Sequence, residues 1–321
     1  MPISVKNSLI LVKTEATPGV DSGPTPAANA VGMQVDDFSS QIEQRSATNE
    51  TVGTGFGSQD MIPYARRGKV AFKVPLAGSG GLTPPSWNVL LGMCAVSETA
   101  GVSPTRLEYM PASTNLKTTS LWAYVNGELG KFAYAVGNGK MLWEAGKVPT
   151  LGVEGTGLVT SVTDVATPAA TLTSWKRPLA FGPATCAGVN LGGTYAAGAI
   201  TGGTFYSLKS LELDMGNDIV DLELAGPESI GVYDWAPKLT LTADIAPAAL
   251  TALYAAMHAG TLTSVGMQHG NVAGSKLLFH AGQCAITGIE DVREGKLFLT
   301  KLSLACQPSS AGNDAWRLVH L

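Results

Sequence analysis

Acidic side chains recur at matching positions in the two halves of this 321-residue chain. When residues 33–53 are aligned without a gap on residues 211–231, three acidic positions coincide at a separation of 178 (214 − 36). The pairs are Asp36 with Asp214, Glu43 with Asp221, and Glu50 with Glu228. Such carboxylates can simply solvate the exposed faces of strands, or they can give a surface a negative potential when both halves are repeated around an axis. The candidates for such a negative wall are Asp36, Glu43, Asp214 and Asp221.

The other residues that could do chemistry show no catalytic or metal-binding pattern. The four histidines all follow residue 257 without ligand spacing, and the four cysteines contain no C-x-x-C pair. The glycine-rich run at residues 53–57 lacks the lysine or third glycine of a phosphate-binding loop, and we expect a flexible loop there. We therefore expect no enzyme activity, no cofactor and no metal, and we expect Cys94 and Cys284 to be core residues.

The elements that would position the acidic pairs also repeat. Residues 69–77 and 238–246 both alternate apolar and polar side chains, which predicts two equivalent strands at a separation of 169 (238 − 69). A helical stripe follows in each half, with Trp87, Leu90 and Leu91 matching Leu250, Leu253 and Tyr254. Residues 146–148 (GKV) also match residues 295–297 (GKL), and the strands that end at residues 151–153 and 302–304 correspond after a two-residue slip. Each half thus reads as strands, a short helix and further strands.

This order predicts a mainly β chain of two tandem β-sandwich or barrel-like domains, each with a small flanking helix. The expected domains are residues 31–158 and 208–306, with an extended N-terminal arm at 1–30, a connector at 159–207 and a C-terminal tail at 307–321. The connector is long for an unstructured loop, so part of it should form a hairpin or lie on a neighbour. The apolar cluster at residues 316–319 should pack on its own domain or on another subunit. A duplicated unit fits a pseudo-twofold monomer or a ring in which one chain fills two places, and the sequence does not choose between them.

Composition favours self-association. Only 14% of the residues are charged and 38 are glycine, which suits a chain surrounded by neighbours. The net charge is −4 with no basic run, so tight binding of nucleic acid is not expected. A small negative net charge instead suits a surface past which DNA slides. No apolar stretch has the length of about 20 residues that a membrane span needs. Because the apolar run at residues 9–12 is too short for a signal peptide, we expect assembly in a cytoplasm.

Several segments resemble the major tail tube proteins of phages with long, non-contractile tails. They are residues 11–19 (LVKTEATPG), 24–30 (PTPAANA), 73–80 (KVPLAGSG), 84–92 (PPSWNVLLG), 121–127 (LWAYVNG) and 211–217 (LELDMGN). The resemblance implies stacked rings around a DNA channel, in which inner strands close a continuous barrel and loops and arms bind successive rings. Most members of the family have one such domain per chain and form hexamers. The duplication in this chain therefore implies three chains per ring with pseudo-sixfold symmetry.

The implied partners are further copies of the chain, a tape-measure protein, and terminator and distal tail proteins. DNA would pass through a negatively lined lumen without specific binding, and no membrane is involved. The expected location is the virion tail, assembled in the host cytoplasm. An alternative is a duplicated β-sandwich binding module for carbohydrate or a cell surface, carried by exposed aromatic residues. Its candidates are Trp122, Tyr124 and Trp143.

Overall fold

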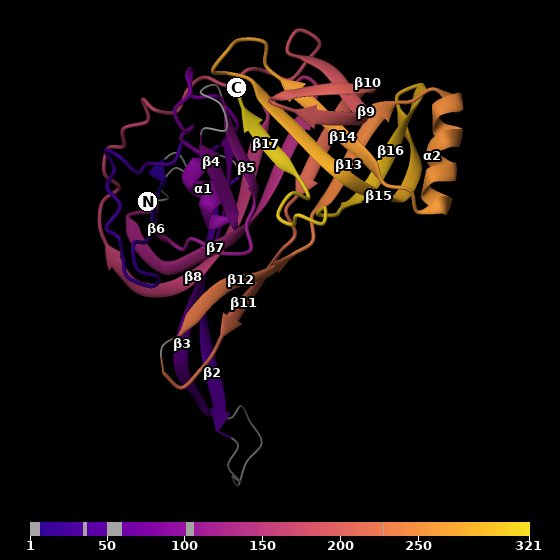
Figure 1. The fold of residues 1–321 in the computed structure, drawn as a ribbon. Helices are drawn as coiled ribbons and strands as arrows, with labels where there is room; N and C mark the ends of the chain where they lie inside the picture. The colour runs from indigo at the N-terminus through magenta and orange to yellow at the C-terminus, as the bar shows by residue number, and fades with distance from the viewer. Residues whose placement is uncertain (1–6, 35–36, 50–59, 101–105, 227) are drawn as a thin grey trace.

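The chain is mainly β, as its alternating apolar pattern predicts (Figure 1). The computed structural model describes residues 7–34, 37–49, 60–100, 106–226 and 228–321. Within these ranges it has seventeen strands and two helices. Fifteen strands join in one sheet, and the other two form a separate hairpin.

The first half contains eight strands and a short helix. These are β1 (Leu9–Thr14), β2 (Ser39–Asn49), β3 (Asp60–Pro75), α1 (Asn88–Met93), β4 (Val96–Ala100), β5 (Leu107–Pro111), β6 (Thr119–Val125), β7 (Glu128–Glu144) and β8 (Thr150–Asp164). The second half contains nine strands and a longer helix. These are β9 (Cys186–Ala196), β10 (Ala199–Asp214), β11 (Asn217–Leu222), β12 (Ser229–Trp235), β13 (Lys238–Asp244), α2 (Pro247–Ala259), β14 (Thr263–His269), β15 (Leu277–Glu294), β16 (Leu297–Cys306) and β17 (Arg317–His320).

The large sheet runs without interruption from one half into the other. Its order is β2-β3-β8-β7-β10-β13-β16-β15-β17-β5-β4. The three neighbouring strands β3-β8-β7 of the first half correspond in order to β13-β16-β15 of the second half. The strand β10 lies between these two groups. Along that junction, residues 210–214 of β10 pair antiparallel with residues 140–144 of β7. The two halves are therefore continuous through backbone hydrogen bonds.

Along β3 and β13, one face of the sheet forms the core and the other is more polar. In β13 the side chains of Leu239, Leu241 and Ala243 are fully buried, while Lys238 and Asp244 at its two ends are exposed. The alternation occurs because successive side chains of a strand point to opposite faces. The equivalent strand β3 buries Val70, Phe72 and Val74 in the same way. The two strands expected at residues 69–77 and 238–246 are thus confirmed.

The two expected helices are present and differ in burial. Leu90 and Leu91 of α1 are fully buried together with Trp87, whose indole nitrogen donates to the carbonyl of Ala77 at 2.7 Å. No residue of α2 is fully buried, although Leu250 and Met257, among others, pack against the main core. Figure 1 shows α2 on the outer side of the second half.

The segments outside the repeated elements also pair with the sheet. Residues 199–206 of β10 form a hairpin with β9, so the connector at 159–207 contains the hairpin that its length predicted. Residues 317–319 of the terminal apolar cluster lie in β17, which pairs with β15 on one side and with β5 of the first half on the other. In the segment expected as an N-terminal arm, β1 pairs with β6 and its Ile10 and Leu11 are fully buried.

Candidate assembly site between the two arms

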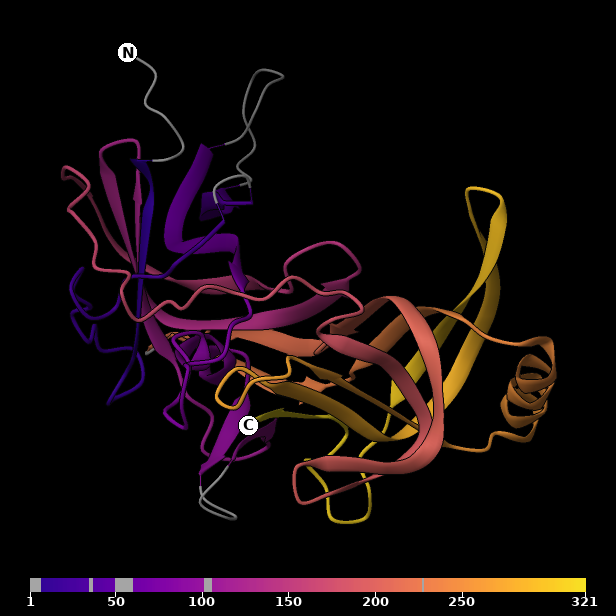
Figure 2. The same ribbon diagram turned by 90° about the horizontal axis from the view of Figure 1, so that it is seen from above.

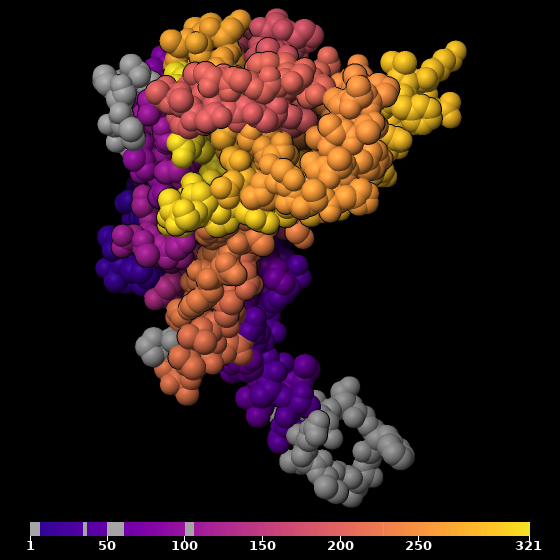
Figure 3. Space-filling model, turned by 45° about the vertical axis from the view of Figure 1, so that its right-hand side comes forward, coloured from indigo at the N-terminus to yellow at the C-terminus, as the bar shows by residue number. Residues whose placement is uncertain are grey.

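Two antiparallel hairpins project side by side from the body of the protein (Figures 1 and 3). The first arm consists of β2 and the part of β3 that pairs with it, from Asn49↔Asp60 to Ser39↔Ala71. The second arm is the hairpin of β11 and β12, which pairs from Asn217↔Trp235 to Leu222↔Ser229. One arm comes from each half of the chain. Any side-chain contact between the arms therefore links the two halves.

The centre of that contact is Arg67 of β3, which is only 1% exposed. Its guanidinium donates to both carboxylate oxygens of Asp221 on β11, from Nε at 2.6 Å and from the second terminal nitrogen at 3.0 Å. The remaining terminal nitrogen donates to Glu228 at 3.0 Å. Two parallel bonds to one carboxylate are the strongest form of this interaction. Burial opposes the charge of Arg67, but the hydrogen bonds and charges of Asp221 and Glu228 outweigh it and raise the pKa of Arg67.

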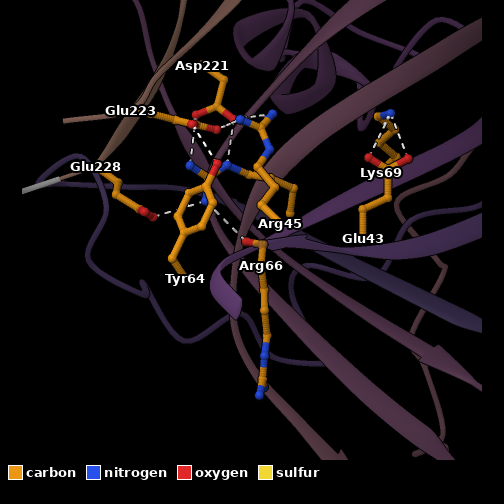
Figure 4. Close-up of polar contacts among 9 residues, drawn as sticks. Glu43, Arg45, Tyr64, Arg66, Lys69, Asp221, Glu223 and Glu228 are labelled. Atoms are coloured by element: carbon orange, nitrogen blue, oxygen red, sulfur yellow. Dashed lines mark hydrogen bonds and ion pairs between the residues drawn. The ribbon is translucent and has the colours of Figure 1, made fainter. Parts of the chain in front are cut away.

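Further charges enclose this pair (Figure 4). Arg45 of β2 contacts Asp221 at 2.9 Å and also forms an ion pair with Glu223. The Tyr64 hydroxyl donates to Glu223 at 3.0 Å. We call the group of Arg45, Tyr64, Arg67, Asp221, Glu223 and Glu228 the clasp. Because each of these bonds runs from the first arm to the second, the clasp fixes the two arms against each other.

The candidate Glu43 lies on the first arm outside the clasp. It accepts two hydrogen bonds from Lys69, at 2.9 and 3.1 Å, and both side chains are more than a third exposed. Asp221, which the repeat aligns with Glu43, has a side chain only 15% exposed. Two residues at aligned positions therefore sit in different environments, one in a solvated pair and the other in a nearly buried one.

The candidate Asp214 lies at the end of β10 on the polar face of the sheet. It accepts a hydrogen bond from the side-chain amide of Asn138 at 2.7 Å and lies 3.5 Å from the ammonium of Lys140. Lys140 also lies 3.7 Å from Glu154, and the charge of Asp214 raises the pKa of Lys140. The structure thus brings Asp214 together with other charges of the polar face but not with the clasp. Asp36 and Glu50 lie outside the described residues.

A second charged cluster links the halves at the opposite end of the sheet. Glu108 of β5 is 4% exposed and contacts Arg106 at 2.6 Å, Arg317 of β17 at 3.0 Å and the Tyr195 hydroxyl of β9 at 2.7 Å. Burial alone would raise the pKa of Glu108, but the hydrogen bonds from Tyr195 and Arg106 and the charges of both arginines hold it below its ordinary value. The two halves are therefore joined by backbone pairing, by the Lys140–Asp214 ion pair and by these two larger clusters.

The arms carry large apolar side chains that the chain itself leaves exposed. Exposed fractions lie between 40% and 65% for six of them. They are Met61, Ile62, Tyr64, Leu222, Leu224 and Tyr233. Exposed apolar residues gathered on a projecting element are typical of a surface that another protein covers.

The aromatic residues that could carry carbohydrate recognition are not exposed in this way. Trp143 is fully buried and Tyr124 is 5% exposed. Trp122 is half-buried, its indole donates to Asp21 at 3.1 Å, and the ammonium of Lys131 lies 3.8 Å from the centre of its ring. These three side chains are engaged within the chain, so none of them supports the binding module.

The remaining candidates for chemistry are structural. His269, His280 and His320 are buried, and Cys94 and Cys284 are core residues as expected. Among the residues that the structure describes, no group of histidine, cysteine and acidic side chains has the arrangement of a metal site. Neither described helix is long and apolar enough to cross a membrane.

The sequence singled out Asp221 as a candidate for a negative wall and Glu228 only as an aligned acidic position, so it did not predict the clasp. It missed Arg45, Tyr64, Arg67 and Glu223 altogether. One signal was available for Arg67. The repeat aligns Arg66 and Arg67 with Trp235 and Ala236, so two positive charges stand where the second half has none. A charge that breaks an internal repeat is a candidate for a contact made once per chain. The contact partner, however, comes from a hairpin more than 150 residues away (221 − 67 = 154).

The fold and the clasp define a mainly β protein whose two halves share one sheet and whose arms carry exposed apolar side chains. The particular family follows from a comparison with known protein families. The family model for phage tail tube proteins matches residues 6–308, so the chain belongs to the phage tail tube protein family. The resemblance noted in the sequence is thereby confirmed. A comparison with curated proteins found no match. The family is one of structural virion proteins that assemble with themselves into a tail tube.

Proposed function

We propose that this protein polymerises as stacked rings of three chains, with pseudo-sixfold symmetry, and forms the conduit through which phage DNA passes from capsid to host cell. The chain makes and breaks no bond in this role and needs no cofactor. Its partners are its own copies, a tape-measure protein during assembly, and terminator and distal tail proteins at the ends. Assembly takes place in the host cytoplasm.

The observation that carries this proposal is the order of strands in the sheet. The groups β3-β8-β7 and β13-β16-β15 follow one another across the β10 junction, so the strand pattern repeats along the sheet within one chain. Repeating a unit side by side closes a ring when the edges at its two ends are complementary, and closure removes exposed strand edges. If each chain supplies two such units, as its duplicated sequence indicates, three chains fill six positions.

The arms support the stacking of rings. They leave the body in one direction and carry exposed apolar side chains, among them Met61, Leu224 and Tyr233 (Figure 3). Contact with a neighbouring ring would remove these side chains from water. The clasp holds the two arms in a fixed relation, which lowers the conformational entropy that such a contact would otherwise lose.

The polar face of the sheet is the proposed wall of the channel. Asp214 lies on this face with Glu212, Glu154 and Lys140, and we propose that it faces the lumen together with Glu43 and Asp36. Asp221 completes the proposed set, although its pairing with Arg45 and Arg67 neutralises much of its charge. A negative wall repels phosphate and keeps DNA from binding as it moves.

Negative-stain electron microscopy of the purified protein at high concentration tests the ring. We expect tubes or rings whose end-on views have threefold symmetry with six similar lobes. Rings with true sixfold symmetry of whole chains would overturn the stoichiometry. Monomers at every concentration, even with a tail initiator complex added, would overturn the tube.

The lumen assignment has its own test. Phage carrying the double variant Asp214→Asn and Glu43→Gln should assemble normal tails but eject DNA more slowly, because the wall repels phosphate less. Asp221 is left intact in this variant so that the clasp is unaffected. Unchanged ejection kinetics with unchanged assembly would reject the role of these carboxylates in the channel.

A further inference from the structure

Two of the four cysteines face each other across neighbouring strands. Cys284 of β15 and Cys306 of β16 are direct partners in the antiparallel ladder. Their Sγ atoms lie 3.7 Å apart, and both thiols are free. Cys94 follows α1 and Cys186 begins β9, so neither belongs to this pair. Two thiols in direct contact are the starting arrangement for a disulfide.

The backbone around the pair has the spacing that a disulfide needs. The amide of Gln307 donates to the carbonyl of Gln283 at 2.8 Å, and hydrogen-bonded pairs alternate with non-hydrogen-bonded ones along antiparallel strands. Cys284 and Cys306 therefore form a non-hydrogen-bonded pair, and the amide of Cys306 accordingly donates to the carbonyl of Pro237 at 3.0 Å, away from β15. The Cα atoms of such a pair lie about 4.5 Å apart, and disulfides span about 4.4–6.8 Å between Cα atoms. Closing the bond thus needs the side chains to rotate but not the strands to move.

The surroundings of the two thiols decide which of them reacts first. Cys284 is 0% exposed and Cys306 is 6% exposed. The hydrogen bond with Cys306 and burial both raise the pKa of Cys284, so its thiol stays protonated in the folded chain. Cys306 is the last residue of β16, and the exposed residues Gln307 and Pro308 follow it. Brief opening of this strand end gives a small oxidant access to Cys306, whereas Cys284 stays within the core.

The pair lies where the hairpin of β15 and β16 joins the rest of the second half. Cys284 also pairs with Thr263 of β14, and the carbonyl that Cys306 contacts belongs to Pro237, just before β13. Residues 285–305 lie between the two cysteines, and Figure 2 shows the hairpin, in yellow, extending from the body. The equivalent strands β7 and β8 contain no cysteine. A bond between Cys284 and Cys306 would therefore fasten the base of one hairpin per chain.

We propose that Cys284 and Cys306 are a modification site that closes to an intrachain disulfide when the protein meets a peroxide. The Cys306 thiol loses its proton and attacks one oxygen of hydrogen peroxide, whose O–O bond breaks to give a sulfenic acid and water. The Cys284 sulfur then attacks the sulfur of the sulfenic acid. The S–O bond breaks, and the departing hydroxide takes the Cys284 proton and leaves as water. Two thiols thus lose two electrons and two protons, and one peroxide is reduced to two waters.

The change of compartment sets the time at which the bond forms. A reducing cytoplasm keeps protein thiols reduced, whereas disulfides persist outside the cell. This timing rests on the proposed function, because it requires a chain that is assembled in the cytoplasm and then released in a particle. The chain would fold and assemble with both thiols free, and the hairpin would be fastened afterwards. The chemistry of the pair itself depends only on the single chain.

Thiol counting on the purified full-length chain tests the proposal. Reduced protein, below the concentration at which tubes form, is treated with hydrogen peroxide, then with catalase, and is denatured in iodoacetamide. We expect two alkyl groups per chain after oxidation and four in the untreated protein, which has four cysteines. Trypsin should release residues 277–293 joined to residues 302–317, and dithiothreitol should separate the two peptides. The closed loop has 23 residues (306 − 284 + 1), so oxidation should raise Tm by about 5 °C, reversibly.

Two variants serve as controls for the unaltered protein. Cys284→Ala should lose both the linked peptides and the Tm shift on oxidation. Cys186→Ala removes the one cysteine that is not buried and should keep both. The proposal is overturned if native protein keeps four alkylated thiols after peroxide treatment, if the link joins other cysteines, or if single cysteines gain oxygen without any link. The count on unaltered protein decides the matter even if Cys284→Ala does not fold.

Failure of the link and failure of the tube are distinguishable. If microscopy shows tubes but the thiols of native chains stay free in peroxide, the disulfide is overturned and the tube function stands. If the link forms in single chains but no rings or tubes appear, the proposed function fails, and the timing inferred from it fails as well. Released particles alkylated directly should contain the link, whereas chains alkylated at cell lysis should not. A link already complete at lysis would overturn the timing.

Discussion

The clasp predicts that substituting Asp221 destabilises the protein, and the internal repeat supplies a control residue, Glu43, at the aligned position. Asp221→Asn removes the negative charge opposite Arg67, which is 1% exposed and donates two of its hydrogen bonds to that carboxylate. Breaking one side of a buried ion pair typically costs about 3–5 kcal/mol, since an uncompensated charge stays buried. Glu228 remains as a partner of Arg67, so we take the lower value, about 3 kcal/mol.

The matched variant is Glu43→Gln at the aligned position. Glu43 pairs with Lys69, and the side chains are 36% and 56% exposed. An exposed pair contributes roughly 0–1 kcal/mol, so this change should have little effect. An unfolding entropy of about 2.1 cal/mol/K per residue gives about 0.7 kcal/mol/K for this chain. Asp221→Asn should then lower Tm by about 4 °C, and Glu43→Gln by about 1.5 °C or less.

The assay is thermal unfolding of unassembled protein, at a concentration below that at which tubes form. Hydrogen exchange by mass spectrometry adds a local measurement, because loosened arms should exchange faster in β11 and β12 than in β13. A double-mutant cycle with Arg67→Met isolates the pair, and we expect a coupling of about 1–3 kcal/mol. Equal Tm shifts for Asp221→Asn and Glu43→Gln, or a coupling near zero, would refute the claim that the clasp joins the halves.

Three further predictions follow from burial. Burial lowers the pKa of three histidine imidazoles. Below about pH 6.5 the unfolded chain therefore binds protons that the folded chain does not. The free energy of unfolding should then fall as the pH is lowered from about 7 to 5, by up to about 1.4 kcal/mol per pH unit for each histidine. The residues are His269, His280 and His320; urea unfolding at several pH values checks this, and a flat profile would contradict it. Burial raises the pKa of the Cys94 thiol to about 12, and Cys284 and Cys306 are also buried. Iodoacetamide should therefore label only Cys186 in native protein and all four thiols after denaturation. Rapid labelling of a second thiol in folded protein would be inconsistent with this core. Phe298→Ser should change the stability of the single chain by no more than about 0.5 kcal/mol, because the side chain is 72% exposed. If an interface between chains buries Phe298, the variant should need a roughly tenfold or higher concentration to assemble, which light scattering can measure. Assembly at the unaltered concentration would exclude Phe298 from the interface.

Much of the fold was determined by local patterns in the sequence. Alternating apolar residues predicted the strands at 69–77 and 238–246, because a strand with one buried face must alternate. The stripe at Leu250, Leu253 and Tyr254 predicted α2 for the same reason at helical spacing. The aligned acidic pairs include Asp221 and Glu228, but the sequence placed Asp221 in a negative wall and did not predict the clasp. The family resemblance also came from the sequence and was confirmed.

Only the tertiary structure decided how these elements meet. Nothing local distinguishes Asp221 from Glu43, since both are acidic residues at aligned positions. One is nearly buried because an arm from the other half of the chain brings Arg67 to it, across 154 positions of sequence (221 − 67). The same holds for the junction between β7 and β10. Strand pairing is made by backbone groups that every residue carries, so side-chain patterns predict that a strand exists but not which strand lies beside it.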